Sequence, residues 1–237
     1  MNVVERYFAP TRGAIREFVG INAFFEPADV ELYARLLPAP FTVPDRPLVI
    51  VAAADYLKAA PWPLTRWQEW GVLLKCEWRG KPGWYPVTTP VTKWLPMSAG
   101  RYLGYPKYIA DSISVARHGD SWSARAVHRG VQQLAMEFQP AIAQSPQTWF
   151  AELLSDESFF KGDVYVVVPP GSGSSAQRVA FSYAEQHWTS RAGLVHLEVD
   201  PNESWAGLVP DHGPLHGQSC HFVGGLNLIA ARLAKAA

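Results

Sequence analysis

The sequence predicts an α+β protein built mostly from antiparallel β-strands, with a single domain over residues 1–237. The chain has 237 residues and 48% of them are apolar, so it can bury a sizeable core in one domain. Short strand-like segments follow one another closely in the middle of the chain, which is typical of an antiparallel sheet or barrel. Twenty prolines and ten tryptophans favour short strands, wide turns and an aromatic-lined interior.

The first half of the chain predicts three strands and one short helix. The strands are expected at Phe18–Phe25, Leu48–Ala54 and Val72–Trp78. Glu26 and Pro27 open the helix, whose apolar face would carry Val30, Tyr33, Leu36 and Leu37, and Pro38 and Pro40 end it. The third strand runs into residues 79–83, whose composition is that of a hairpin turn.

The second half predicts a strand-rich region closed by a helix. Strands are expected at Ser112–Arg117, Trp122–His128, Val131–Phe138, Val164–Val168, Arg178–Trp188 and Leu194–Val199. A helix is expected at Pro146–Leu154. A closing helix rich in alanine and leucine is expected at Gly225–Ala236.

The most informative segment is the run from Gly100 to Tyr108, which contains Lys107 directly after a proline. Aromatic and apolar residues surround this lysine in the sequence, and the next charge downstream is Asp111. Burial disfavours the charged form of an amine, and a neutral amine attacks carbonyl groups to form Schiff bases. Most lysines are solvated surface residues, so the local sequence alone leaves that interpretation open for Lys107.

The same run resembles the acetoacetate decarboxylase family, in which a Gly-Arg pair precedes an aromatic-Pro-Lys segment. The pair at 100–101 and the Tyr-Pro-Lys at 105–107 match that pattern. The resemblance implies an acetoacetate decarboxylase-like β-barrel core with a few peripheral helices, and it implies that Lys107 forms the Schiff base. The match departs at Tyr108, where the family enzyme has a second lysine.

Glu69 is the second candidate, because the resemblance places a proton-handling glutamate just before the equivalent of the Val72 strand. Glu69 lies between two tryptophans in Trp67-Gln68-Glu69-Trp70, which favours a partly apolar setting. Burial raises the pKa of a carboxylic acid and suits it to acid–base catalysis. The alternative is a carboxylate at the rim of the site, beside Arg66.

Three further residues are candidates near the lysine. Tyr105 and Tyr108 flank it, and either phenol could hydrogen-bond a substrate oxygen or relay a proton, although simple packing is the more common role of a tyrosine. We expect Tyr108 to take part in catalysis and Tyr105 to bind the substrate. The main role expected for Arg101 is to stabilise the loop, and its secondary role is to bind an anionic group of the substrate. The family's early arginine and second glutamate fall near Val19 and Ala52, so no partner for a substrate carboxylate is evident.

Charge and motif content exclude several classes of function. Twenty-one basic residues balance twenty-one acidic ones, which predicts no nucleic-acid footprint and no membrane-binding basic patch. His212, His216, Cys220 and His221 form the best candidate metal cluster, but loop and strand histidines explain the pattern, because Pro214 to Leu228 also resembles the family's final strand. We therefore expect no metal and no cofactor. A cytoplasmic homo-oligomer is expected.

Two functions remain open from the sequence. The first is a lyase of the decarboxylase, aldolase or dehydratase type, acting through a lysine iminium on a small-molecule oxo acid, ketone or aldehyde. The second is a non-catalytic module of the same fold that binds a small apolar ligand among aromatic side chains.

Overall fold

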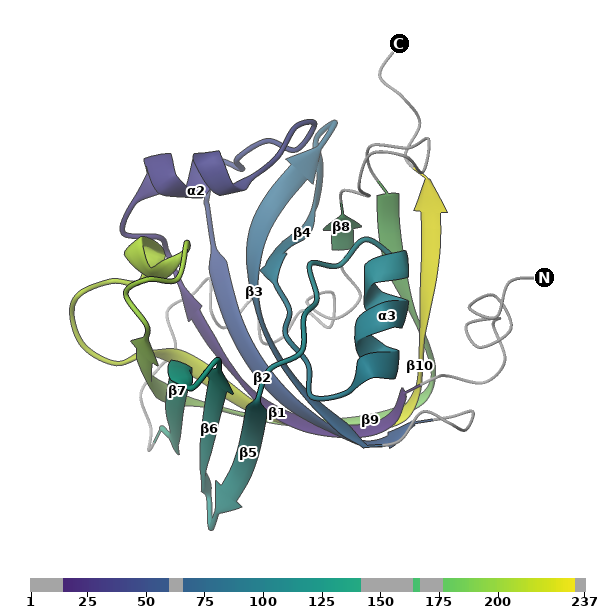
Figure 1. The fold of residues 1–237 in the computed structure, drawn as a ribbon, viewed down its shortest axis with the longest axis vertical. Helices are drawn as coiled ribbons and strands as arrows, with labels where there is room; N and C mark the ends of the chain where they lie inside the picture. Colours follow the sequence, from purple (N-terminus) through teal and green to yellow (C-terminus); the bar gives the residue numbers. More distant parts are fainter. Residues whose placement is uncertain (1–14, 60–65, 142–163, 167–176, 233–237) are drawn as a thin grey trace.

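The computed structural model describes residues 15–59, 66–141, 164–166 and 177–232, and ten strands in this part of the chain form one sheet (Figure 1). The strand order is β10-β1-β2-β3-β4-β8-β9-β7-β6-β5, and β10 also pairs with β9. Every pairing is antiparallel except the single parallel pair between β4 and β8. The mostly antiparallel α+β class is therefore confirmed, whereas a closed barrel stays a prediction.

The strand bounds are β1 (Ile15–Phe25), β2 (Val49–Ala59), β3 (Trp67–Trp78), β4 (Lys81–Thr88), β5 (Ser112–His118), β6 (Ser121–His128), β7 (Val131–Pro140), β8 (Val164–Val166), β9 (Gln177–Val199) and β10 (Leu215–Arg232). The predicted strands around residues 18–25, 48–54, 72–78, 112–117, 122–128 and 131–138 are all confirmed. The helix expected at Pro146–Leu154 lies outside the described residues.

Two short α-helices and one 3-10 turn accompany the sheet in the described part of the chain: α2 (Val30–Leu36), α3 (Trp94–Tyr102) and η1 (Ala206–Leu208). The predicted first helix is α2, but it begins at Val30 instead of at Glu26 and Pro27, because Asp29 caps it by accepting a 2.8 Å hydrogen bond from the Leu32 amide. Val30, expected on the apolar face, is exposed, whereas Tyr33 and Leu37 are buried. No described helix has the length and apolar character needed to cross a membrane.

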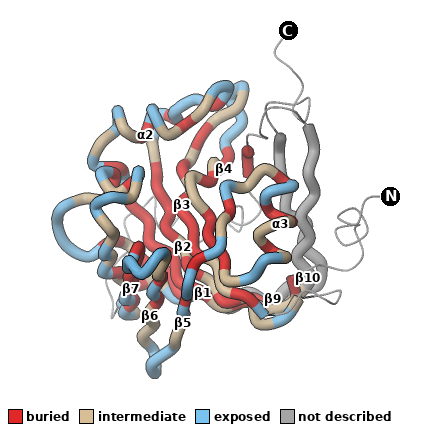
Figure 2. Tube along the Cα trace, viewed as in Figure 1, coloured by how far each residue is buried: buried red, intermediate tan, exposed pale blue. Residues whose placement is uncertain are grey.

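The sheet carries core side chains on both faces, and its central strands are buried (Figure 2). One face of β1–β3 packs against α2, η1 and the β5–β7 hairpins, with Trp70, Tyr33 and Phe138 fully buried there. The other face carries smaller clusters, to which Leu103 and Met97 contribute from the region of α3. The candidate site lies on this second face, beneath α3 and the loop that follows it.

The predicted closing helix is wrong, because residues 225–232 continue β10 as a strand. They pair with residues 177–184 of β9 after a bulge near Gly224. Alanine and leucine favour a helix only weakly, and long-range pairing with β9 overrides that preference.

The two strands expected at residues 178–188 and 194–199 are one continuous strand, β9. Gly193 lies in the part of β9 between the two expected strands. It marks a close approach of β7, because a Cβ there would overlap the Phe138 ring and the Gln139 carbonyl oxygen.

Candidate active site

Lys107 lies in a tight loop that leaves the end of α3. The Tyr105 amide donates to the Gly100 carbonyl at 2.9 Å, and Gly104 takes a positive φ of 94° to make that turn. The Lys107 amide then donates to the Tyr105 carbonyl at 2.8 Å across Pro106. The proline in the sequence pattern therefore sits at the bend that aims Lys107 back toward the sheet.

A short extended segment, residues 89–92, joins this loop to the start of β3. Val91 bridges to Glu69 on one side and to Ile109 on the other. The Val91 amide donates to the Tyr108 carbonyl at 2.9 Å, and the Trp70 amide donates to the Pro90 carbonyl at 3.2 Å. This segment brings the Lys107 loop alongside Glu69, although 38 positions separate the two residues in sequence.

Lys107 and Glu69 form a partly buried ion pair. The Lys107 Nζ lies 2.5 Å from Glu69 Oε2, and 9% and 16% of the two side chains are exposed. At this distance the carboxylate can take a proton directly from the ammonium group. The alternative of a rim carboxylate beside Arg66 does not describe this geometry, since Arg66 pairs with Asp55 instead.

The two tryptophans that flank Glu69 have different roles. Trp67 lies on the same face and directs its Nε1 toward Glu69 Oε2 at 3.4 Å. Trp70 lies on the opposite face, within the main core and against Trp205. Glu69 lies within β3, where successive side chains point to opposite faces of the sheet. Trp67, two residues before Glu69, therefore shares its face, and Trp70, the next residue, does not.

Gly100 makes room for the lysine side chain. A Cβ at this position would overlap the Cδ and Cε atoms of Lys107. Gly100 lies near the end of α3, seven residues before the lysine, and the helix backbone at this glycine lies directly against the lysine's aliphatic chain. The Gly-Arg pair is visible in the sequence pattern, whereas this contact is visible only in the structure.

A Gly100→Ala variant tests that contact. Alanine favours a helix over glycine by about 1 kcal/mol, so the free energy of unfolding is expected to change little even if the new methyl group displaces Lys107. Displacement of a reacting group by about 1 Å lowers reaction rates by about a hundredfold, and we expect a decrease of that order in covalent capture of a carbonyl compound. Ser98→Ala on the same helix is the control. Capture at the parental rate would show that the lysine tolerates the added methyl group.

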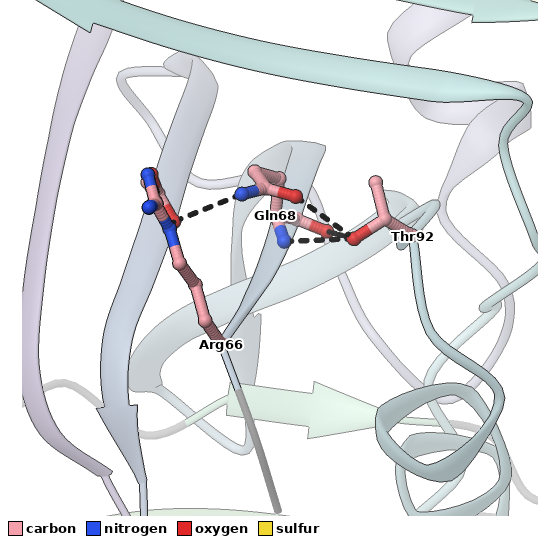
Figure 3. A network of polar contacts seen from close by, with 4 residues as sticks. Arg66, Gln68 and Thr92 are labelled. Atoms are coloured by element: carbon pink, nitrogen blue, oxygen red, sulfur yellow. Dashed lines mark hydrogen bonds and ion pairs between the residues drawn. The ribbon is translucent and has the colours of Figure 1, made fainter.

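A polar network at the start of β3 holds the 89–92 segment in place (Figure 3). Thr92 Oγ1 accepts from the Gln68 amide at 2.9 Å and donates to Gln68 Oε1 at 3.1 Å. Gln68 Nε2 in turn donates to Asp55 Oδ1 at 3.1 Å, and Arg66 makes a bidentate contact with the same carboxylate. Asp55 is buried and accepts hydrogen bonds from both Gln68 and Arg66, so this network fixes the part of β3 directly before Glu69 against the 89–92 segment. No local sequence pattern indicates this network, because its four residues come from three separate segments.

Arg101 and Tyr105 both contact the lysine, in different ways. Arg101 donates its Nε to the Lys107 carbonyl oxygen at 2.6 Å, so it braces the loop as expected. The Tyr105 ring centroid lies 5.7 Å from Lys107 Nζ. Burial, together with the nearby Glu69 charge, raises the pKa of the Tyr105 phenol, so this hydroxyl stays protonated and can donate a hydrogen bond.

Tyr108 is directed to another part of the molecule. Its hydroxyl lies 2.9 Å from Gln133 Nε2 on β7, and its ring packs against His128 at 4.8 Å between centroids. Gln133 Nε2 also donates to Glu203 Oε1 at 2.6 Å. Burial is the main cause that raises the pKa of Tyr108. The structure thus brings together Lys107, Glu69, Tyr105 and Arg101, and it connects Tyr108 to β6 and β7.

The face of the sheet around Glu69 also carries two buried amides that sequence analysis missed. In the β-register, Glu69 lies opposite Ala54, and the next row on the same face joins Gly71, Ala52, Asn22 and Gln218. Asn22 and Gln218 are 5% and 4% exposed. A polar residue among the apolar residues of a buried strand is a signal that could have indicated each amide. The signal does not connect the two, because β1 and β10 are far apart in sequence.

The histidines and cysteine near the C-terminus do not converge. His216 and Cys220 share one face of β10, while His221 points to the other and lies 3.1 Å from Glu17. Among the described residues, no three His, Cys, Asp or Glu side chains are grouped as metal ligands would be. Both cysteines are free and buried.

Comparisons with known proteins give one family and one fold. The acetoacetate decarboxylase family model matches residues 12–218. The acetoacetate decarboxylase from Legionella pneumophila is 15% identical, with a TM-score of 0.67 over 97% of this chain and 96% of that chain. Another acetoacetate decarboxylase structure, 13% identical, gives 0.72 over 95% and 91%.

The enduracididine biosynthesis enzyme MppR complexed with pyruvate is similar as well. It is 15% identical and gives a TM-score of 0.62 over 93% of this chain and 91% of that chain. A comparison with curated proteins finds no match. At these identities the solved structures show a shared fold.

Proposed function

This chain belongs to the acetoacetate decarboxylase family, and from that premise we propose that it is a lyase in which Lys107 forms a Schiff base with a small oxo compound. The observation that carries the proposal is the partly buried pair of Lys107 Nζ and Glu69 Oε2, 2.5 Å apart. A nucleophilic amine with a proton acceptor in direct contact is the arrangement that covalent catalysis by lysine requires.

The proposed reaction begins when Glu69 takes a proton from the ammonium group. The Nζ lone pair then bonds to the carbonyl carbon of the substrate. Glu69 passes two protons to the carbonyl oxygen, the one taken from the ammonium group and a second that the attached nitrogen loses, and this oxygen departs as water. The resulting iminium accepts the electron pair of an adjacent carbon–carbon bond as that bond breaks, which gives an enamine. Protonation of the enamine carbon and addition of water release the product and restore Lys107.

We propose supporting roles for Tyr105 and Arg101. Tyr105 lies beside both Lys107 and Glu69, and its protonated phenol can donate to the substrate oxygen. Arg101 keeps the lysine loop in shape through the Lys107 carbonyl, and its remaining guanidinium nitrogens are the ones that could meet an anionic substrate group. Loss of carbon dioxide, aldol cleavage and dehydration all proceed from the same iminium, and the family includes decarboxylase structures.

Borohydride reduction with intact-mass analysis tests the proposal. The protein is incubated with a panel of oxo acids, ketones and aldehydes and then reduced. We expect one adduct, with the mass of the carbonyl compound less one oxygen atom, and peptide mapping is expected to place it on Lys107. Failure of the whole panel to give an adduct would favour the alternative of a non-covalent binding module.

For Tyr108 the contacts favour a positioning role over proton transfer. Tyr108→Phe keeps the ring against His128 and removes the hydroxyl bonded to Gln133. We expect the free energy of unfolding to fall by about 0.5–1.5 kcal/mol, as for loss of one hydrogen bond, while adduct formation changes less than about threefold. Denaturant unfolding and timed borohydride trapping measure the two effects. If turnover fell a hundredfold or more while the free energy of unfolding stayed unchanged, Tyr108 would have a direct role in catalysis.

A further inference from the structure

The sheet face that carries Glu69 has small, uncharged side chains next to the reactive pair. Its first row joins Glu69, Ala54, Gly20 and Cys220 across four strands, and its second joins Gly71, Ala52, Asn22 and Gln218. Directly opposed residues on neighbouring strands project from the same face. In these two rows, as the described strands place them, Glu69 is the single charged residue.

Within these two rows of the described strands, a substrate carboxylate would meet no lysine or arginine of the sheet. The one titratable side chain in the next row is His216, opposite Phe24, and burial lowers its pKa, so it is neutral at neutral pH. Arg101 is exposed, with its Nε engaged by the Lys107 carbonyl. The one cation of the reactive pair, Lys107, is already paired with Glu69 at 2.5 Å. An anionic substrate group at these two rows would therefore meet no free cation, which disfavours its binding.

Asn22 offers a hydrogen-bond donor that suits an uncharged oxygen. It is 5% exposed, and its Nδ2 has no hydrogen-bond partner of ordinary geometry within the described residues. The neighbouring Cys220 thiol is a weak acceptor: burial raises the pKa of that thiol to about 12, and the Asn22 amide lowers it only in part. Since Cys220 shares the row of Glu69, the amide lies on the reactive face. Buried polar groups almost always have partners, so an unpaired amide there indicates a ligand oxygen.

We propose that the substrate is an uncharged oxo compound with a second oxygen, a hydroxyl or carbonyl, which the Asn22 amide binds. This inference rests on the function proposed above and narrows its substrate class. Two strand spacings separate β3 from β1, so Glu69 and Asn22 are on the order of 10 Å apart across the sheet. The side chains at the two ends of this distance shorten the gap that the substrate must bridge. A chain of about three carbons between the imine carbon and the second oxygen fits that gap. Gln218, opposite Asn22 and 4% exposed, lies beside it on the same face.

Three ketones with one carbon skeleton test the proposal: pentan-2-one, 5-hydroxypentan-2-one and 4-oxopentanoate. They carry, in turn, no second oxygen, a hydroxyl and a carboxylate at the same end. The measurement is the concentration at which half of Lys107 is trapped by borohydride. We expect 5-hydroxypentan-2-one to have the lowest value and 4-oxopentanoate a value at least about tenfold higher. Equal or tighter capture of 4-oxopentanoate would overturn the proposal.

Asn22→Leu, a substitution of similar size, isolates the amide. The half-trapping concentration of 5-hydroxypentan-2-one is expected to rise about tenfold, toward the value for pentan-2-one, because one hydrogen bond is lost. The value for pentan-2-one should stay unchanged. An equal rise for both ketones would show that Asn22 only supports the fold and would overturn its assignment. The order of the three ketones in the parent protein needs no variant, so it tests the substrate class even if Asn22→Leu does not fold. Absence of an adduct with these and with all other carbonyl compounds would instead overturn the Schiff-base function.

Discussion

Lys107→Ala is expected to form no borohydride-trapped adduct with any carbonyl compound that labels the parent protein, and its turnover is expected to fall to background. The reason is that the Lys107 amine is the only nucleophile that the proposed reaction uses, so no partial route remains without it. Intact mass after reduction and a turnover assay with the best-captured compound measure the two effects.

Two variants separate nucleophilicity from charge and from general lysine reactivity. Lys107→Arg keeps a cation beside Glu69, but a guanidinium group does not deprotonate in proteins and cannot form an imine, so this variant should be equally inactive while folding normally. Lys93→Ala removes an exposed lysine just before α3 and should behave as the parent. An adduct that persists in Lys107→Ala would assign the chemistry to another lysine.

Glu69→Gln is expected still to form the borohydride-trapped adduct on Lys107. Its turnover is expected to be about a hundredfold to ten-thousandfold slower than that of the parent, the range typical of a lost general acid–base residue. Glutamine preserves the size of the side chain and can still hydrogen-bond to the amine, but it cannot exchange a proton with it. Single-turnover kinetics measures the slow step, and trapping confirms that the imine still forms.

The control for Glu69→Gln is Glu137→Gln, which neutralises an exposed carboxylate on β7. It should leave both trapping and turnover unchanged. If Glu69→Gln itself turned over within a few-fold of the parent, Glu69 would act only as the counter-ion of Lys107 and another group would carry the protons.

Strong local patterns predicted most of the sheet. The hairpins β5 to β7 were evident because Gly119 and Gly130 mark tight turns, both with positive φ, between alternating segments. Pro38 correctly ended α2. In each case the information is local, since a few adjacent residues determine the turn or the helix end.

The errors arise where distant partners decide the structure. Residues 225–232 have the composition of a helix but pair with β9. Residues 189–193, expected to separate two strands, continue β9 and pair with β10. Helix α3 was not predicted because its N-cap, Lys93, makes no side-chain capping bond and because Pro96 and Gly100 lie within it. The proline is tolerated in the first turn, where amides lack helical partners, and the glycine is required by Lys107.

The candidate site was predictable to the extent that its residues lie in one segment. The Gly-Arg to Pro-Lys spacing pointed to Lys107, and the structure places Glu69 in contact with it. Asn22 and Gln218 come from strands at opposite ends of the chain, which no local pattern connects. Tyr108 follows Lys107 in sequence, but the alternation of an extended chain directs consecutive side chains to opposite sides, toward Glu69 and toward Gln133.

The position of β10 has a consequence for how the protein is made. This last strand pairs with β1, the first described strand, and with β9, so that Phe18 lies opposite Phe222. While the ribosome is still translating, β1 has β2 as a neighbour and an open edge on its other side. Open strand edges pair with other chains, and contacts of such long sequence separation form slowly. The nascent chain therefore keeps this open edge until β10 has left the ribosome, and the sheet cannot be completed before then.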